Sequence, residues 1–387
     1  MSLLASTAHP VLNPDVNPLL RVFLKKTFYA QFCAGENVAE VRQTIASLKK
    51  IGFAGVILGY AKEVVLTDSQ MKGLESCISG SVAEECVRNE IGPWAAGTKE
   101  TVMLASPGDF VALKFTGAGR QALYALSKRL PPPAALASAI DDICELAVSR
   151  GIRLLFDAEQ QALQPGIDDW SLEYMRKYNT LDRAVIFGTY QAYLKATPTT
   201  LSRHLAAASQ GGFTLGVKLV RGAYLGSDPR HLIHDTKADT DSAYDSIAEA
   251  LMKQQWKTPL QPSSSDRTSS PFPNVALVLA THNRESVLKG RTLLSEGGIK
   301  TDVAFAQLQG MADEVSCELL TAGNEEANVE RPRAYKYLVW GTTGECMKYL
   351  LRRAHENRDA VQRTRSGRDA MRTELLRRVK GLFGLGN

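Results

Sequence analysis

The sequence predicts an α/β protein in which eight parallel strands close into a (βα)8 barrel, and three observations lead to this prediction. Short apolar runs recur along the chain between residues 53 and 343. Several of these runs do not alternate with polar residues, as is typical of strands that are covered on both faces. Helical segments separate the runs, which favours parallel pairing, and eight is the number of strands that closes such a barrel.

Each of the eight runs is rich in Val, Ile, Leu or Phe. In chain order they are "FAGVILGY" (53–60), "DFVALKFT" (109–116), "IRLLFDAE" (152–159), "RAVIFGTYQAY" (183–193), "TLGVKLVRGAY" (214–224), "VALVLATHN" (275–283), "DVAFAQLQG" (302–310) and "YKYLVWGTT" (335–343). A helical segment near residues 18–50 precedes the first run. Another, before the third run, carries Leu136, Ile140 and Ile143 on one face and stops at Gly151.

The chain of 387 residues is long enough for one barrel with additional segments. We expect residues 1–50 to form a helical segment that packs on the barrel, residues 51–365 to form the barrel, and residues 366–387 to form an amphipathic helix. The Pro- and Ser-rich stretch at 258–273 is expected to be a flexible loop. Residues 62–101 are polar and helical in propensity, and they indicate no function.

The composition excludes several classes of protein. Hydrophobic residues make up 44% of the chain, and the net charge of +5 comes without a basic tract interleaved with aromatics, so nucleic acid is not an expected partner. Six cysteines without a C-x-x-C pair argue against zinc and disulfides and for a reducing compartment. No run has the length of a membrane span, and no secretory signal or transit peptide is evident before Arg21.

Familiar catalytic motifs are missing from the sequence. No G-x-S-x-G, Walker A or G-x-G-x-x-G motif follows a strand, and the Gly-rich "FTGAGRQ" at 115–121 matches none of them. Among the histidines only His231 and His234 are spaced three residues apart, and their polar surroundings favour the surface. No metal site is therefore predicted.

Polar residues that end the apolar runs are the candidates for a site, because active sites of such barrels lie at the carboxyl ends of the strands. They are Lys114, Asp157, Glu159, Gln191, Lys218, Arg221, Tyr224, His282, Asn283, Gln307, Gln309 and Tyr337. Cations beside a carboxylate would suit a flavin, because positive charge near the ring stabilises its reduced anion. A Schiff base on Lys114 or Lys218, as in an aldolase, also fits, whereas a barrel that only binds a partner would leave these charges without a role.

Two adjacent arginines, Arg352 and Arg353, follow the last run in "YLVWGTTGECMKYLLRRAHENRDAV" (337–361). Neighbouring helical residues point about 100° apart. One interpretation is that one arginine faces water while the other pairs with Glu356. The other is that this helix crosses the barrel mouth and that both guanidinium groups hold a carboxylate.

Several motifs resemble the proline dehydrogenase family, the FAD-dependent enzymes of proline catabolism. They are "LKF" (113–115), "FDAEQQ" (156–161), "YQAYLK" (190–195), "KLVRGAYL" (218–225), "ATHN" (280–283), "QLQGM" (307–311) and "YLVWGTTGECMKYLLRRAHEN" (337–357). "TFYAQFCAGE" (27–36) is similar to the N-terminal segment of eukaryotic monofunctional members. The resemblance implies a distorted TIM-type barrel with the last helix over its mouth, and oxidation of L-proline to Δ1-pyrroline-5-carboxylate by hydride transfer to FAD.

The resemblance also implies roles for individual residues. Arg352 and Arg353 would hold the proline carboxylate and Glu356 would orient them, while Lys114 and Tyr337 would form the substrate pocket. Asp157 and Lys218 would act in catalysis. The residues expected to face FAD are Ala158, Gln191, Lys218, Arg221, Gly222, Ala223, Tyr224, Thr281, His282 and Asn283. Many bacterial relatives have Arg in place of Lys218 and Lys in place of Arg221; both charges are kept, but the resemblance does not assign the exact flavin contact of either residue.

The implied partners are L-proline, a quinone that accepts the electrons, and a separate pyrroline-5-carboxylate dehydrogenase, since the chain is too short to carry that domain. The implied location is the matrix side of the mitochondrial inner membrane in a eukaryote, as in fungi. The alternative is a close relative that oxidises hydroxyproline or another cyclic imino acid, which would bind the same flavin in a pocket with a different lining. The segment 368–387, with Leu375, Leu376 and Phe383 opposite Arg377, either contacts the membrane or docks on the barrel.

Overall fold

The computed structural model describes residues 13–61, 74–262, 271–321 and 332–360. They belong to two compact units. Residues 33–341 form the first, here called the barrel unit. The terminal unit combines residues 13–32 with residues 342–360. The predicted C-terminal helix at 366–387 lies outside the described residues, as does half of the predicted loop, from 263 to 270.

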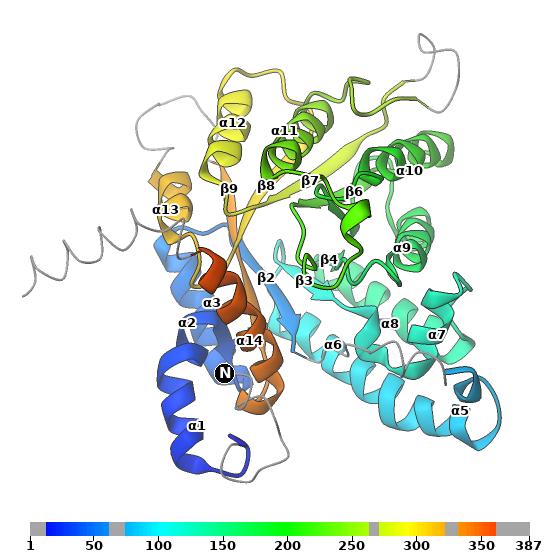
Figure 1. Ribbon diagram of the computed structural model, residues 1–387, viewed down its shortest axis with the longest axis vertical. Helices are drawn as coiled ribbons and strands as arrows, with labels where there is room; N and C mark the ends of the chain where they lie inside the picture. The colour runs from blue at the N-terminus through cyan, green and yellow to red at the C-terminus, as the bar shows by residue number, and fades with distance from the viewer. Residues whose placement is uncertain (1–12, 62–73, 263–270, 322–331, 361–387) are drawn as a thin grey trace, which may run out of the picture. The chain divides into compact units, whose positions relative to one another are not determined.

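Eight parallel strands form the closed barrel of the barrel unit (Figure 1). They are β2 (Gly55–Tyr60), β3 (Phe110–Leu113), β4 (Arg153–Phe156), β5 (Ile186–Gln191), β6 (Leu215–Val220), β7 (Val275–Ala280), β8 (Asp302–Leu308) and β9 (Arg333–Trp340). Each strand pairs with the next, and β9 pairs with both β8 and β2, which closes the sheet. The predicted fold is confirmed: seven of the apolar runs contain a strand, and the eighth overlaps β9.

Helices cover the outside of these strands (Figure 1). They are α3 (Val38–Ile51), α6 (Gly92–Leu104), α7 (Arg120–Ser127), α8 (Ala134–Arg150), α9 (Gln164–Tyr178), α10 (Thr197–Gly211), α11 (Lys237–Lys253), α12 (Arg284–Ser295) and α13 (Asp313–Thr321). Helix α5 (Gly80–Cys86) packs on α7 and on the helical turns at 74–77 and 87–91. Helix α8 confirms the apolar face and the glycine stop that the sequence pattern predicted. It buries Leu136, Ile140 and Ile143 and ends at Gly151, whose φ of 66° is a left-handed conformation that glycine adopts without strain.

Two apolar layers hold the barrel together. The larger one lies between the strands and the helices, and the smaller one fills the barrel interior. In the interior, the ring of Phe110 meets Phe187 and Tyr335 edge to face, with ring centroids 5.5 and 5.1 Å apart. These aromatic side chains fill the barrel between its two ends, so each end presents a separate surface.

One strand was not predicted. The three residues of β1 (Cys33–Gly35) lie inside the segment that was expected to be helical, and they pair with Val339 and Trp340 of β9. Strand β8 pairs with β9 only as far as Tyr337, which leaves backbone groups beyond it without a partner on that side. Strand β1 satisfies them, because buried N–H and C=O groups need hydrogen bonds.

The terminal unit contains α1 (Pro18–Leu24), α2 (Ala30–Phe32), a π-helix (Lys25–Tyr29) between them, and α14 (Thr343–Ala360). Helix α14 packs against the π-helix, and the backbone N–H of Gly344 donates to Asp15. Helix α1 begins at Asn17, whose side chain accepts from the N–H groups of Leu19 and Leu20. None of the helices in the described ranges is long and apolar enough to cross a membrane.

Candidate active site

Asp157 is the centre of a buried cluster at the carboxyl ends of the strands. It follows β4 directly and is 4% exposed. Its Oδ1 accepts from Nζ of Lys218 at 2.5 Å, and its Oδ2 accepts from the hydroxyl of Tyr337 at 2.8 Å. Nζ of Lys114 lies 3.4 Å from Oδ2. The barrel thus brings together four predicted site residues from β3, β4, β6 and β9.

The two lysines keep Asp157 ionised. Burial by itself would raise the pKa of the carboxyl group, but the charges of Lys218 and Lys114 and the hydrogen bonds from Lys218 and Tyr337 lower it to about 2. Asp157 is therefore an anion at every pH at which the protein would work, and it is too weak a base to accept a proton there. It serves to hold two ammonium groups and one phenol at fixed positions.

The cluster also fixes the ring of Tyr337. Nζ of Lys218 lies 5.2 Å from the ring centroid, within the range of a cation–π interaction. On β2, the absence of a side chain at Gly59 makes room for the hydroxyl, because a Cβ there would lie 3.1 Å from that oxygen. Sequence reasoning missed Gly59, since a glycine inside a strand carries no chemical signal of its own.

Buried polar atoms without partners lie at the same end of the barrel. Gln191, the last residue of β5, accepts from the backbone N–H of Ala223 at 3.2 Å, but its Nε2 has no hydrogen-bond partner among the described residues. The same holds for Oγ1 of Thr189, beside Lys218 in the sheet register, and for Oε1 of Gln309. Such atoms are costly unless a ligand satisfies them. With the ammonium group of Lys218, they fit the polar edge of a flavin ring.

Arg221 belongs to a second network, on the helix side of β6. Its Nε donates to Oγ1 of Thr281 at 3.0 Å and its Nη2 to Oγ of Ser286 at 2.7 Å, while Nη1 pairs with Asp241. Its guanidinium also lies 5.0 Å from the ring centroid of Tyr244. Arg221 therefore joins β6 to α11 and α12 and positions Thr281.

Two neighbouring candidates also have structural partners. Asn283 caps α12, since its side chain accepts from the N–H of Ser286 at 3.0 Å. Nε2 of His282 accepts from the N–H of Leu308 at 3.1 Å, which connects the ends of β7 and β8. Its Nδ1 therefore carries the proton in the neutral ring.

Asp228 connects the loops that follow β4, β5 and β6. Its buried carboxylate accepts from the hydroxyl of Tyr193 at 2.5 Å and from the N–H of Gln161 at 2.9 Å. The ring of Tyr193 fills the space beside Gly222, where φ is 155° and a Cβ would lie 2.5 Å from ring carbons. Tyr224 adds a further link, because its hydroxyl donates to the carbonyl of Ala158 at 3.3 Å. Sequence reasoning did not identify Asp228.

The arginine pair lies in the terminal unit. Arg353 is 5% exposed, and its guanidinium carbon lies 5.1 Å from the ring centroid of Tyr349. The side chains of Arg352 and Glu356 lie outside what the structure describes. Helix α14 and the barrel belong to different units. The predicted position of α14 over the barrel mouth therefore stays a prediction.

Comparisons with known proteins agree with one another. A family model described as proline dehydrogenase matches residues 41–366. A probable mitochondrial proline dehydrogenase of Schizosaccharomyces pombe is 31% identical and is aligned over 93% of this chain and 81% of its own length. A hydroxyproline dehydrogenase of Bos taurus is 28% identical, with 92% and 82% covered.

Among solved structures, proline utilization A from Bdellovibrio bacteriovorus, inactivated by N-propargylglycine, matches with a TM-score of 0.65 at 17% identity. The match covers 89% of this chain and 34% of that chain. At this level of identity the likeness shows the fold alone.

Proposed function

Because the chain belongs to the proline dehydrogenase family, we propose that it oxidises L-proline to Δ1-pyrroline-5-carboxylate with FAD as the oxidant, in the first step of proline catabolism. The Asp157 cluster is the observation that carries most of this proposal. It places two ammonium groups and the ring of Tyr337 at the carboxyl ends of the strands, where barrel enzymes have their active sites.

On the substrate side, Tyr337 would pack over the ring of proline while Asp157 holds its hydroxyl. Lys114 would line the same pocket. Arg352 and Arg353 would bind the proline carboxylate in the bidentate geometry that guanidinium groups favour, with Glu356 orienting them. This fixed orientation would keep the reacting C–H bond of the ring directed at the oxidant, which lowers the entropic part of the barrier.

Bound FAD would supply a ring that accepts two electrons and one hydrogen from the substrate as a hydride. Lys218 would place a positive charge beside that ring and stabilise it when reduced. Nε2 of Gln191, buried and without a partner in the described chain, would donate to it. The other residues proposed to line the cofactor are Ala158, Arg221, Gly222, Ala223, Tyr224, Thr281, His282 and Asn283.

The proton balance follows from the low pKa of Asp157. Oxidation of the C–N bond requires the secondary amine of proline in its neutral form, because its lone pair forms the new C=N bond. Since the pKa of Asp157 is about 2, this carboxylate does not take the ammonium proton, which leaves to solvent before the oxidation. The rate of flavin reduction should therefore rise with pH until the bound amine is neutral, and a rate independent of pH would contradict this step.

The electron acceptor and location are part of the proposal. A quinone would reoxidise the flavin, which requires peripheral contact with a membrane, and a separate pyrroline-5-carboxylate dehydrogenase would consume the product. The mitochondrial relatives support a mitochondrial location, and the matrix side of the inner membrane is the location that we propose. The similarity to a bovine hydroxyproline dehydrogenase supports a second candidate substrate, hydroxyproline.

The decisive experiment is the visible spectrum of the purified protein, before and after anaerobic addition of L-proline. We expect a yellow protein that L-proline bleaches and D-proline does not. Faster bleaching by trans-4-hydroxy-L-proline would favour the second candidate. A colourless protein that does not bind added FAD, and that borohydride links to an aldehyde substrate through Lys114 or Lys218, would replace the proposal with aldolase chemistry.

A further inference from the structure

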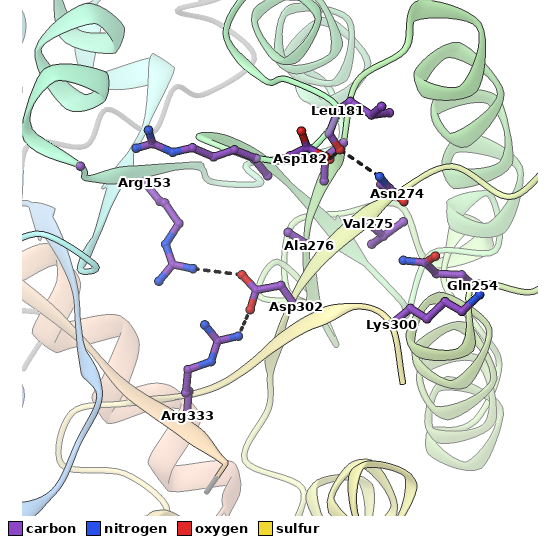
Figure 2. Close-up of a pocket in the computed structure, with 14 residues that line it drawn as sticks. Arg153, Leu181, Asp182, Gln254, Asn274, Val275, Ala276, Lys300, Asp302 and Arg333 are labelled. Atoms are coloured by element: carbon purple, nitrogen blue, oxygen red, sulfur yellow. Dashed lines mark hydrogen bonds and ion pairs between the residues drawn. The ribbon is translucent and has the colours of Figure 1, made fainter. Parts of the chain in front are cut away.

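A cavity of about 490 Å³ opens at the amino ends of the strands, opposite the end that carries Asp157 (Figure 2). Three charged side chains of its lining, Arg153, Asp302 and Arg333, come from the first residues of β4, β8 and β9. Ala184 and Ala276 line it too, and both belong to the apolar cluster of the barrel interior. The cavity is therefore separated from the candidate active site by the packed interior of the barrel.

Two arginines share one carboxylate in this cavity. Figure 2 shows the guanidinium groups of Arg153 and Arg333 directed at Asp302 from different sides. Nη1 of Arg153 lies 3.7 Å from Oδ2 of Asp302, and Arg333 pairs with Oδ1. Arg153 cannot move away, because its guanidinium lies 3.8 Å from the ring centroid of Phe110 and its Nη2 donates to the carbonyl of Gly108 at 2.8 Å.

The cavity carries more positive than negative charge. Its lining has four cationic side chains, Arg153, Arg183, Lys300 and Arg333, against two carboxylates, Asp182 and Asp302, which leaves two positive charges in excess. Among the residues that the structure describes, Arg183 and Lys300 have no salt bridge within 4 Å. The cavity therefore has unneutralised cations on parts of its rim away from Asp302.

These cations also act on one another. Burial lowers the pKa of Arg153, and the nearby charge of Arg183 lowers it further. Burial lowers the pKa of Arg333 as well, with a further lowering from Arg153. Arginine stays protonated under such conditions, and Asp302 offsets only part of this positive charge, so a further counter-charge would be favourable.

We infer that this amino-end cavity binds a small multivalent anion, either a phosphate or a di- or tricarboxylate. Its volume lies within the usual range of about 300–1,000 Å³ for small-molecule sites. An anion with two charges would match the excess of two, and the fork of N–H donors on Arg333 suits both carboxylate and phosphate oxygens. The inference does not depend on the proposed oxidation of proline, because the cavity and the Asp157 cluster lie at opposite ends of the barrel.

The test is the thermal stability of the full-length protein, with whatever cofactor it retains, in chloride, inorganic phosphate or citrate at equal ionic strength. A ligand that binds only the folded state stabilises it by RT ln(1 + [L]/Kd), so the melting temperature rises with the logarithm of the ligand concentration once that concentration exceeds Kd. We expect phosphate or citrate to raise the melting temperature over chloride with this logarithmic dependence, and the smaller dissociation constant of the two identifies the ligand class. Equal melting temperatures in all three salts would overturn the inference.

The matched variants are Lys300→Gln with Arg183→Gln inside the cavity, and Lys99→Gln with Arg129→Gln outside it. Lys300 and Arg183 are exposed and make no salt bridge in the described chain, so their double variant should fold. We expect the cavity variant to bind the anion about tenfold more weakly. The outside variant also removes one lysine and one arginine charge, and it should bind the anion normally. Equal weakening in both variants would mean a general charge effect and no site.

Discussion

The two ends of the barrel use the same arrangement, one carboxylate between two cations, for different purposes. At the carboxyl end Asp157 has a side chain 6% exposed and two lysines beside it. At the amino end Asp302 has a side chain 47% exposed and two arginines beside it. Burial separates the two cases, because desolvation makes each charge of the first cluster depend on the others, while water screens much of the second.

The two clusters also use different cations, lysine at the carboxyl end and arginine at the amino end. A lysine ammonium is a compact charge that a neighbouring carboxylate can hold at one point, as Asp157 holds Lys218. An arginine can lie flat on an aromatic ring, as Arg153 does on Phe110, and still present N–H donors to a cavity. This difference agrees with the two proposals, a reaction at the carboxyl end and anion binding at the amino end.

The largest difference between the two ends should appear in activity. We expect Asp157→Asn to lower kcat/KM for L-proline about 100-fold or more, because Lys218, Lys114 and Tyr337 lose their common anchor. The matched change Asp302→Asn should leave kcat/KM within about threefold. Steady-state kinetics with an artificial quinone would measure both. Equal losses in the two variants would end the functional distinction between the two clusters.

The amino-end cluster should matter more for the free energy of unfolding than for activity. Arg153→Ala removes a nearly buried cation stacked on Phe110 and leaves Asp302 with one partner, so we expect a loss of about 3 kcal/mol in the free energy of unfolding. Arg129→Ala removes an exposed arginine that pairs with Asp169 and should cost less than about 1 kcal/mol. Urea unfolding of both variants gives the values. In Arg153→Ala, flavin reduction should remain close to that of the unmodified protein.

Asp228 tests whether the loops of the carboxyl end form one unit. Tyr193→Phe leaves the buried carboxylate of Asp228 without one of its donors, which should cost about 2 kcal/mol. We expect FAD to bind about tenfold more weakly, since the ring of Tyr193 supports Gly222. Fluorescence titration of the apoprotein with FAD measures this directly. Unchanged affinity with the same loss of stability would make the Asp228 network purely structural.

The smallest effect concerns pH. Because the folded-state pKa of Asp157 is about 2, below its ordinary value of 3.8, its ionised form stabilises the fold at pH values above about 4. This contribution, of about 2 kcal/mol, should be lost as the pH falls through about 2. The stability difference between the unmodified protein and Asp157→Asn should therefore narrow between pH 4 and pH 2. A constant difference over that range would show that folding does not lower the pKa of Asp157.

The sequence predicts the four residues of the carboxyl-end cluster. Lys114, Asp157, Lys218 and Tyr337 were all named because polar residues at strand ends of a parallel barrel must meet at one edge. Contacts between residues far apart in the chain gave no comparable signal. Tyr193 and Asp228 are 35 residues apart, and nothing in their spacing indicates that one holds the other.

The sequence by itself determined the class of the fold, the eight strands of the barrel, the family and the four residues of the Asp157 cluster. It did so because strands buried on both faces must be continuously apolar, and polar side chains are then confined to their ends. Only the tertiary structure decided which charges meet: Lys218 on Asp157, Arg221 on the helix side, and Arg153 with Arg333 on Asp302. The physical reason is that ion pairing depends on distance and burial, and both are properties of the closed barrel.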